Sequence, residues 1–442
     1  MLARRLALSS FVAVALVASC TVPRGDGGTS GSPTAASTPA GQTSGGSTEA
    51  PTVSGSASAS PSEPPSSTVR ILAPHRGGSL LVRGRYPHVD STCKRFHQPR
   101  LEARYPGLLS IRRADDGGLS LTVTLPFEQY LQGIAEMPPS WPSAALEAQA
   151  VAARSYALAS TGWSGREGDK LDTPICSTSS CQVYGGLPVG AVGQTRRWWR
   201  AVRRTRGEVL LFDGRPADAV YFSTSNGHTY GNEDVFGSDP LPYLRPVVER
   251  DDGASGVSRW SVTIPYRDLA SFLARAGRWP EGAAVARVKH SGGAVKVSGD
   301  GETRTIGLRD FRDVVNANAP CLKPGRYPGS LPSTIPSVWL SMSSGPNAVT
   351  ITGRGWGHGV GMVQWGAYGK ANLGWSADRI LAYYYGGLHP QPYPEPGLIH
   401  VRVADGLDEL KVVPSGPGAK LNGQRVGRGP IVVGGSLLPA AP

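Results

Sequence analysis

One carboxyl group stands in surroundings that suit proton transfer. Glu136 lies in the stretch IAEMPPSWP, where Ile134, Met137 and Trp141 are its apolar neighbours. A carboxyl beside apolar groups is harder to ionise, so its pKa should rise, and a general acid needs a pKa near the working pH. The alternative is a structural role, in which Glu136 interacts with the dipole of the following helix or caps it.

A glycine run, GRGWGHGVGMVQWG, extends from Gly353 to Gly366. No start position in it satisfies G-x-G-x-x-G and no Gly-Lys-Ser/Thr follows, which excludes the usual nucleotide-binding loops. It contains one histidine, His358, and no HExxH motif, so we expect no metal site. A backbone with so few side chains, with Trp365 nearby, is suited either to binding a sugar polymer closely or to tight packing in the core. His358, Gln364 and Trp365 are the candidate groove residues.

Other polar candidates lie in the turn-rich stretch STSNGH and on a helix. The hydroxyls of Ser223, Thr224 and Ser225, together with His228, could bind sugar groups or could satisfy their own turn. A serine hydrolase is not expected, because the G-x-S-x-G elbow is missing. Arg154 could bind substrate or form a buried ion pair.

Four blocks, in chain order, resemble the SpoIID/LytB family of bacterial cell-wall proteins: YLQGIAEMPPSWPSAALEAQAVAARSYALA (130–159), CQVYGG (181–186), YFSTSNGHTYGNEDVFGSDPLPYLRPV (221–247) and GRGWGHGVGMVQWGAYGKANLGWSADRILAYYYGG (353–387). The resemblance implies a lytic transglycosylase, which cuts the bond between N-acetylmuramic acid and N-acetylglucosamine in peptide-stripped glycan strands and leaves anhydro ends. It implies that Glu136 is the catalytic acid. One carboxyl can suffice, since the sugar's own 6-hydroxyl attacks and no water is activated.

The same family also implies an alternative from another class, a non-enzymatic enhancer that binds glycan and stimulates an N-acetylmuramoyl-L-alanine amidase. We expect no cofactor in either case. Some relatives bind zinc through cysteines and histidines around the second block. Here CSTSSCQ has no histidine, so a disulfide between Cys176 and Cys181 is expected instead. Asn226 stands where a glycine is common, and asparagine tolerates positive φ.

The expected elements give an α+β fold with mixed sheets, because helices and strands alternate without a regular βαβ repeat. A helix from about Pro142 to Ser160 has alanines on every side, which predicts a buried helix at the active site, and a short helix at 127–135 precedes it. Residues 69–395 should form a SpoIID-like domain, and alternating patterns predict a small β appendage at 396–442. Other helices are expected at 266–276, 308–316 and 377–385, and strands at 207–212, 219–225, 260–264, 338–342 and 348–352.

The first residues are typical of an exported lipoprotein. A basic start and an apolar core of about 14 residues, too short to span a membrane comfortably, predict a signal peptide at 1–19. VASC resembles a lipobox, so Cys20 should be lipidated; an ordinary signal or an uncleaved anchor is the alternative. Residues 20–68, rich in Gly, Ser, Thr and Pro, predict a disordered tether. The protein should therefore be lipid-anchored at the outer face of the cell membrane.

Charge and cysteines complete the expectations. The net charge of +12 favours binding to anionic polymers of the wall or to anionic lipid. The alternative is a generally basic surface with no specific partner. Nucleic acid is not an expected partner outside the cell. The expected partners are glycan strands, a cell-wall amidase and the membrane. With Cys20 lipidated and Cys176 paired with Cys181, the remaining pair is Cys93 with Cys321.

Overall fold

The structure, a computed structural model, describes residues 68–74, 78–85, 101–113, 117–163, 165, 173–187, 195–328 and 331–434. The predicted signal peptide, Cys20 and the tether as far as residue 67 lie outside this part of the chain. Within it, no helix is both long and apolar enough to cross a membrane.

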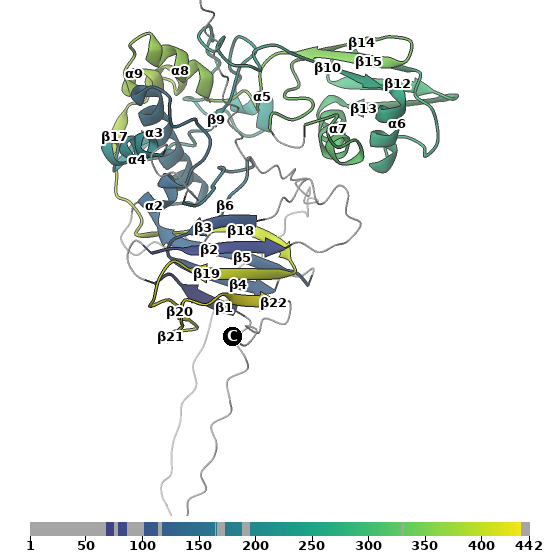
Figure 1. Cartoon of the computed structure of the whole chain (residues 1–442). Coiled ribbons are helices and arrows are strands. Elements are labelled where there is room, and N and C mark those ends of the chain that lie inside the picture. Colours follow the sequence, from purple (N-terminus) through teal and green to yellow (C-terminus); the bar gives the residue numbers. More distant parts are fainter. Residues whose placement is uncertain are drawn as a thin grey trace, which may run out of the picture. The chain divides into compact units, whose positions relative to one another are not determined.

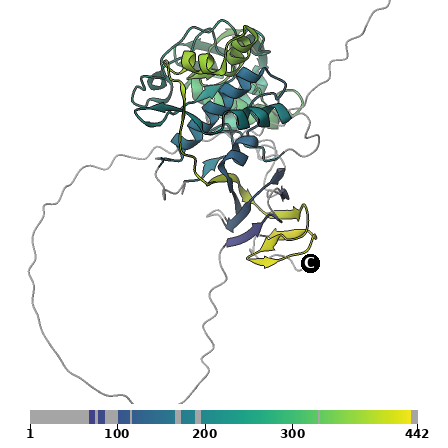
Figure 2. The ribbon, with the colours of Figure 1, turned by 90° about the vertical axis from the view of Figure 1, so that its left-hand side faces the viewer.

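The strands from the two ends of the chain pair with one another. One sheet has the order β21-β20-β1-β4-β5-β18-β6 and another has the order β22-β19-β2-β3. In Figures 1 and 2 purple N-terminal strands accordingly lie beside yellow C-terminal ones. The strands of these two sheets are β1 (Thr68–Leu72), β2 (Leu80–Arg85), β3 (Leu101–Tyr105), β4 (Leu108–Arg113), β5 (Leu119–Pro126), β6 (Ile175–Cys176), β18 (Leu398–Leu407), β19 (Glu409–Pro414), β20 (Lys420–Leu421), β21 (Gln424–Arg425) and β22 (Ile431–Gly434).

The C-terminal segment is therefore part of the sheets and not an appendage with its own boundary at residue 396. Its β pattern was predicted correctly, but β18 lies between β5 and β6, with Val401 opposite Val123. Ile399 and Val401 are fully buried in the main core. The reason is that an alternating strand buries one face only against a partner, and the partners are supplied by residues more than 250 positions earlier.

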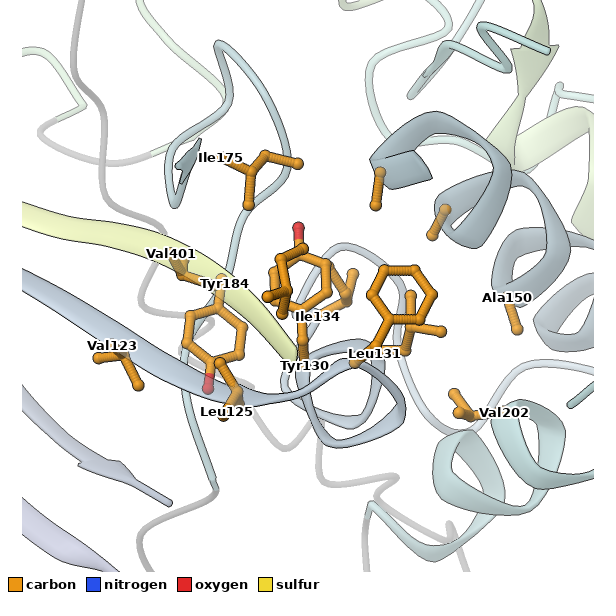
Figure 3. Packing of buried hydrophobic residues seen from close by; sticks show 14 of the residues in the cluster. Val123, Leu125, Tyr130, Leu131, Ile134, Ala150, Ile175, Tyr184, Val202 and Val401 are labelled. Atoms are coloured by element: carbon orange, nitrogen blue, oxygen red, sulfur yellow. The ribbon is translucent and has the colours of Figure 1, made fainter. Parts of the chain in front are cut away.

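A group of helices continues directly from β5. The central helix α3 packs against α4, α8, α9 and β7, and six of its eight alanines are buried, in agreement with the prediction. Figure 3 shows side chains of α2 and the residues after it, including Leu131 and Ile134, between the strand residues Val123 and Val401 and the helix residue Ala150. The elements of this part are α2 (Phe127–Gln132), α3 (Ser143–Ser160), α4 (Arg196–Arg204), β7 (Glu208–Phe212), β8 (Arg215–Pro216), β9 (Tyr221–Phe222), α5 (Asn232–Phe236), β16 (Met362–Val363), α8 (Gln364–Asn372), α9 (Ala377–Tyr384) and β17 (Pro390–Pro392).

Residues between β9 and the glycine run build a second hydrophobic core. It joins two three-stranded sheets, β10-β15-β14 and β11-β12-β13, to a pair of packed helices, α6 and α7. Its elements are β10 (Trp260–Pro265), α6 (Tyr266–Arg275), β11 (Arg287–Ser291), β12 (Ala294–Gly299), β13 (Glu302–Gly307), α7 (Leu308–Leu322), β14 (Leu340–Ser344) and β15 (Ala348–Gly353). The α+β class is thus confirmed.

Local patterns predicted α2, α3, α6 and α9 to within three residues and some strands poorly. The strand expected at 219–225 is reduced to the two residues of β9, which pair in parallel with β16. Helix α7 continues to Leu322, six residues past its predicted end, with Pro320 inside it. Helices α4, α5 and α8 were not predicted, and α4 and α8 both contribute contacts to the candidate site.

Candidate active site

Glu136 lies in the loop between α2 and α3, and this loop is held on two sides. On one side Ala135 N–H donates to the carbonyl oxygen of Val183 over 2.9 Å. On the other, α4 donates the indole N–H groups of Trp198 and Trp199 to the last carbonyls of α2, over 3.0 and 3.1 Å. The unpaired carbonyls at the end of a helix need such partners. Helix α4 therefore caps the C-terminal end of α2 and positions the loop that follows.

The Glu136 carboxyl accepts two hydrogen bonds. Its Oε1 accepts from the Val183 N–H over 2.9 Å, and its Oε2 accepts from the Tyr221 hydroxyl. Burial raises the pKa of Glu136 from 4.5 to about 7, although both hydrogen bonds act to lower it. The side chain is half-buried, so a ligand can still reach it. A carboxyl with this pKa can give a proton and take one back near neutral pH.

Tyr221 is itself held by a chain of buried hydrogen bonds. Gln182, fully buried, donates to the Tyr221 hydroxyl over 3.0 Å and to the Ala153 carbonyl over 3.1 Å. Its Oε1 accepts from the Tyr130 hydroxyl over 2.7 Å. Burial raises the pKa of Tyr221 well above its usual value, so the hydroxyl stays protonated and can donate to Glu136.

Sequence reasoning missed Tyr130, Gln182 and Tyr221 as site residues. All three lie inside the blocks quoted above, in YLQG, CQVYGG and YFSTS. Tyr130 and Tyr221 are polar groups beside apolar residues in a predicted helix and a predicted strand, a signal that is compatible with burial in a network, while Gln182 lies in the loop for which no element was predicted. Nothing local indicated that the three would meet one another and Glu136.

His358 acts on the backbone that carries Tyr221. Its Nε2 lies 2.8 Å from the Tyr221 carbonyl oxygen, and its Nδ1 accepts from the Val360 N–H over 3.1 Å. A carbonyl can only accept, so Nε2 carries the proton and the ring is neutral. Burial lowers the pKa of His358 to about 4, in keeping with this tautomer. Both ring nitrogens are occupied by protein groups, so the predicted groove histidine is a support for Tyr221.

The glycine run packs against protein along residues 220–230. A Cβ added to Gly355, which has φ +71°, would lie 2.5 Å from the Thr224 carbonyl oxygen. One added to Gly361, with φ +73°, would lie 2.0 Å from that of Val220. These two glycines are required by close packing and by their positive φ, which favours the core-packing alternative for them over direct contact with a glycan.

The hydroxyls predicted to bind sugar serve the fold. Thr224 Oγ1 lies 2.7 Å from Ser255 Oγ, and Ser225 donates its N–H and its hydroxyl to Asp252 Oδ2 over 2.7 and 2.8 Å. Thr224 and Ser225 are buried. Ser223 is half-buried, and its Oγ lies 3.1 Å from Thr224 Oγ1. His228 is exposed with its ring 4.5 Å from that of Tyr230.

Arg154 is fully buried on α3 and its guanidinium is occupied by protein acceptors. It donates to Glu128 Oε1 over 3.0 Å and to the carbonyls of Val202 and Glu208, both over 3.2 Å, and lies 3.7 Å from Glu395 Oε1. This is the buried ion pair that was the alternative to substrate binding. Arg154 connects α3 to α2, α4 and β7, so it stabilises the site from behind.

Gln364 and Trp365, at the start of α8, do lie next to the Glu136 loop. Gln364 Nε2 is 3.5 Å from the Glu136 carbonyl oxygen and 3.4 Å from Gln149 Oε1. The Trp365 ring is 4.8 Å from that of Trp141, the tryptophan of the same loop. Trp365 and Tyr368, whose rings are 5.4 Å apart, are half-exposed and offer aromatic faces beside Trp141 of the same loop.

Helix α8 is anchored by a buried cation. Lys370 Nζ donates to Glu249 Oε1 over 3.0 Å and to Asp251 Oδ2 over 2.9 Å, and it lies 4.6 Å from the Tyr383 ring centre. The Tyr384 hydroxyl also donates to Glu249. This cluster ties the residues that follow the third block to α8 in the fourth block.

The predicted disulfide between Cys176 and Cys181 is present, with the two Cα atoms 5.5 Å apart. It closes the loop that precedes Gln182 and Val183, the residues that contact Tyr221 and Glu136. For the other pair, Cys321 is buried in α7, and Cys93 lies outside the described residues, so that pairing stays a prediction.

This chain is similar to known proteins over the region that contains Glu136. A family model described as stage II sporulation protein matches residues 115–212. Stage II sporulation protein D of Bacillus subtilis is 28% identical over 287 residues, which cover 60% of this chain and 74% of that protein. The amidase enhancer of Bacillus subtilis is 29% identical over 290 residues, which cover 57% of this chain and 38% of that protein.

An uncharacterised protein of Brachyspira hyodysenteriae is 32% identical over 272 residues, which cover 60% of this chain. The match spans 66% of that protein, just under two thirds of its length.

Proposed function

The chain belongs to the SpoIID/LytB family, and from this membership we propose that it is a peptidoglycan lytic transglycosylase. Its substrate is the glycan strand after removal of the stem peptides, and it cleaves between N-acetylmuramic acid and N-acetylglucosamine. The observation that carries the proposal is the half-buried Glu136 carboxyl, with a pKa of about 7, at the head of an ordered hydrogen-bond network.

Glu136 supplies both proton transfers. In its protonated form it gives a proton to the glycosidic oxygen as the bond from that oxygen to the muramyl C1 breaks. The carboxylate then takes the proton of the muramyl 6-hydroxyl as O6 bonds to C1, which closes the anhydro ring. No water is consumed and Glu136 ends protonated, ready for the next cycle. Val183 N–H and the Tyr221 hydroxyl stabilise the transient carboxylate.

The test is product analysis on amidase-treated glycan strands. The wild type should give fragments with anhydromuramyl ends, detected by mass spectrometry, and Glu136→Gln should give none. Glu147→Gln is the matched control, because Glu147 lies on α3 and pairs with the exposed Arg204, so its cleavage should equal that of the wild type. Absence of anhydro products from the wild type, or equal amounts from Glu136→Gln, would refute the mechanism.

A second function is favoured by the relative named amidase enhancer. In that case the same site binds glycan without cutting it, and a cell-wall amidase works faster beside it. The signature would be glycan binding with no anhydro products, together with faster release of stem peptides when an amidase is added. Glu136→Gln would then leave the stimulation unchanged.

We also propose that the protein acts outside the cytoplasm, anchored through a lipid on Cys20. The support is the basic and apolar start of the chain followed by VASC. Cells expressing the full-length chain and fed an alkyne-tagged fatty acid should label the wild type and not Cys20→Ala. An unlabelled wild type in the soluble exported fraction would favour an ordinary signal peptide.

A further inference from the structure

A cavity of about 730 Å³ opens beside the glycine run, at one end of the sheet β10-β15-β14. Its walls carry two tryptophans and two arginines, Trp260, Trp339, Arg259 and Arg354, and the amide of Asn226. The proposed cleavage uses none of these five residues.

The two tryptophan rings are fixed in place by the glycine run. The Trp260 indole N–H donates to the Gly355 carbonyl over 3.0 Å, and a Cβ added to Gly353 would lie 2.2 Å from that ring. The Trp339 ring stacks on Tyr230, with centroids 5.6 Å apart and planes 11° from parallel. Both tryptophans are half-exposed. Aromatic faces that are already oriented need little ordering when a ligand binds.

The two arginines supply positive charge without a protein partner. Arg259 and Arg354 are exposed, and neither guanidinium has a hydrogen bond or an ion pair within the described part of the chain. No carboxylate lines the cavity. A guanidinium presents a planar fork of donors that matches a carboxylate, so the cavity combines faces for a sugar ring with donors for an acidic group.

The cavity is joined to the Glu136 site by consecutive residues. The Trp339 ring contacts the Phe222 ring, at a centroid distance of 6.1 Å, and Phe222 follows Tyr221, whose hydroxyl holds Glu136. The cavity and the Glu136 site therefore both contact β9, the cavity through Phe222 and Glu136 through Tyr221.

We propose that this cavity binds a carboxylated sugar of the glycan strand, namely a muramyl residue whose lactyl group is a free carboxylate. The inference rests on the proposed glycan substrate and adds how the strand is selected. A stem peptide converts the lactyl carboxylate into a neutral amide, which removes the partner of Arg259 and Arg354. Only peptide-free strands can then both stack a sugar ring on the tryptophans and pair a carboxylate with the arginines.

The test measures binding and so does not depend on cleavage. Full-length protein carrying Glu136→Gln is titrated with peptide-free glycan strands and with chitooligosaccharides of equal length, which have the same sugar rings and no lactyl group. The muramyl strands should bind about tenfold more tightly, as expected for one charge-assisted contact. Adding Arg259→Gln and Arg354→Gln should remove this preference and leave chitooligosaccharide binding unchanged.

Arg287→Gln is the matched control, since Arg287 is an exposed arginine on β11 that does not line the cavity. Equal affinity of the starting protein for the two glycans would overturn the proposal, as would a preference that survives the double substitution. Tighter binding of poly(glycerol phosphate), lost with the same arginines, would overturn it in favour of a phosphate polymer. If no anhydro products form but the preference depends on the arginines, the proposed cleavage fails and this site stands.

Discussion

At the scale of single residues, opposing influences set the state of Glu136. Burial favours the neutral acid, while the Val183 N–H and the Tyr221 hydroxyl favour the carboxylate. The result is a pKa of about 7, which leaves both forms populated near neutral pH. A carboxyl without burial would be ionised and unable to give a proton, and one without the two donors would hold its proton more tightly and be a weaker acid.

Replacement of Tyr221 by phenylalanine should move the pH dependence of cleavage. The hydroxyl lowers the pKa of Glu136 by donating to it, so its loss raises that pKa further. The alkaline limb of kcat/KM, which reports loss of the acid form, should move to higher pH. Tyr266→Phe, in the second core, is the control and should leave the limb in place. An unmoved limb in Tyr221→Phe would show that the hydroxyl does not act on Glu136.

Glu136 should also make stability depend on pH. Its pKa is about 7 in the folded chain against an ordinary 4.5. A raised pKa means that the stabilising contribution is full below about 4.5 and is lost as pH rises through about 7. Glu136→Gln removes this loss, so its advantage in free energy of unfolding should be larger at pH 8 than at pH 4.5, by at most about 3 kcal/mol.

Urea unfolding of the wild type and Glu136→Gln at the two pH values measures this difference. Glu147→Gln should show no comparable change between the two pH values. A difference for Glu136→Gln that is the same at both pH values would mean that the carboxyl is not perturbed by folding.

At the scale of elements, the Glu136 loop is held by the helices around it. α4 binds the end of α2 through Trp198 and Trp199, and α3 is joined to its neighbours through Arg154. Burial raises the pKa of Glu128, one partner of Arg154, to about 7, against the lowering effect of the arginine. Removal of the cation would leave the Glu128 and Glu395 carboxyls close together and without compensation.

Arg154→Met should therefore lower the free energy of unfolding, and any effect on glycan binding should follow from that loss of stability. Breaking a buried ion pair by removing one partner typically costs about 3–5 kcal/mol, and thermal unfolding should show a correspondingly large fall in Tm. Arg204→Met removes the exposed pair with Glu147 and should cost less than about 1 kcal/mol. A stable Arg154→Met protein with weakened glycan binding would instead support the substrate-binding role.

At the scale of the whole molecule, the chain ends are joined in common sheets. β18 lies between β5 and β6, and β19 lies between β2 and β22. The helix that precedes Glu136 follows β5 without a break. The C-terminal strands thus support the strand from which the site begins, although they are more than 250 residues away from it in the sequence.

Truncation after residue 396 should prevent cooperative folding of the rest of the chain. It exposes the edge of β5 and the buried side chains that pack on Ile399 and Val401. The measurement is cooperative thermal unfolding followed by circular dichroism. Truncation after residue 434, which keeps every described strand, is the control and should unfold like the full chain. A soluble, cooperative product of the shorter truncation would restore the idea of a separable appendage.

The sequence by itself indicated the family, the buried alanine-rich helix and the short-range disulfide, and it singled out Glu136 as the candidate acid. These depend on motifs and on residues close together in the chain, where local spacing carries the information. The tertiary structure decided that Gln182, Tyr221 and His358 converge behind Glu136, that Arg154 is a buried support, and that the last strands complete the first sheet. Such contacts join segments 26 to 288 residues apart, and their geometry follows from which faces pack together, which no local pattern specifies.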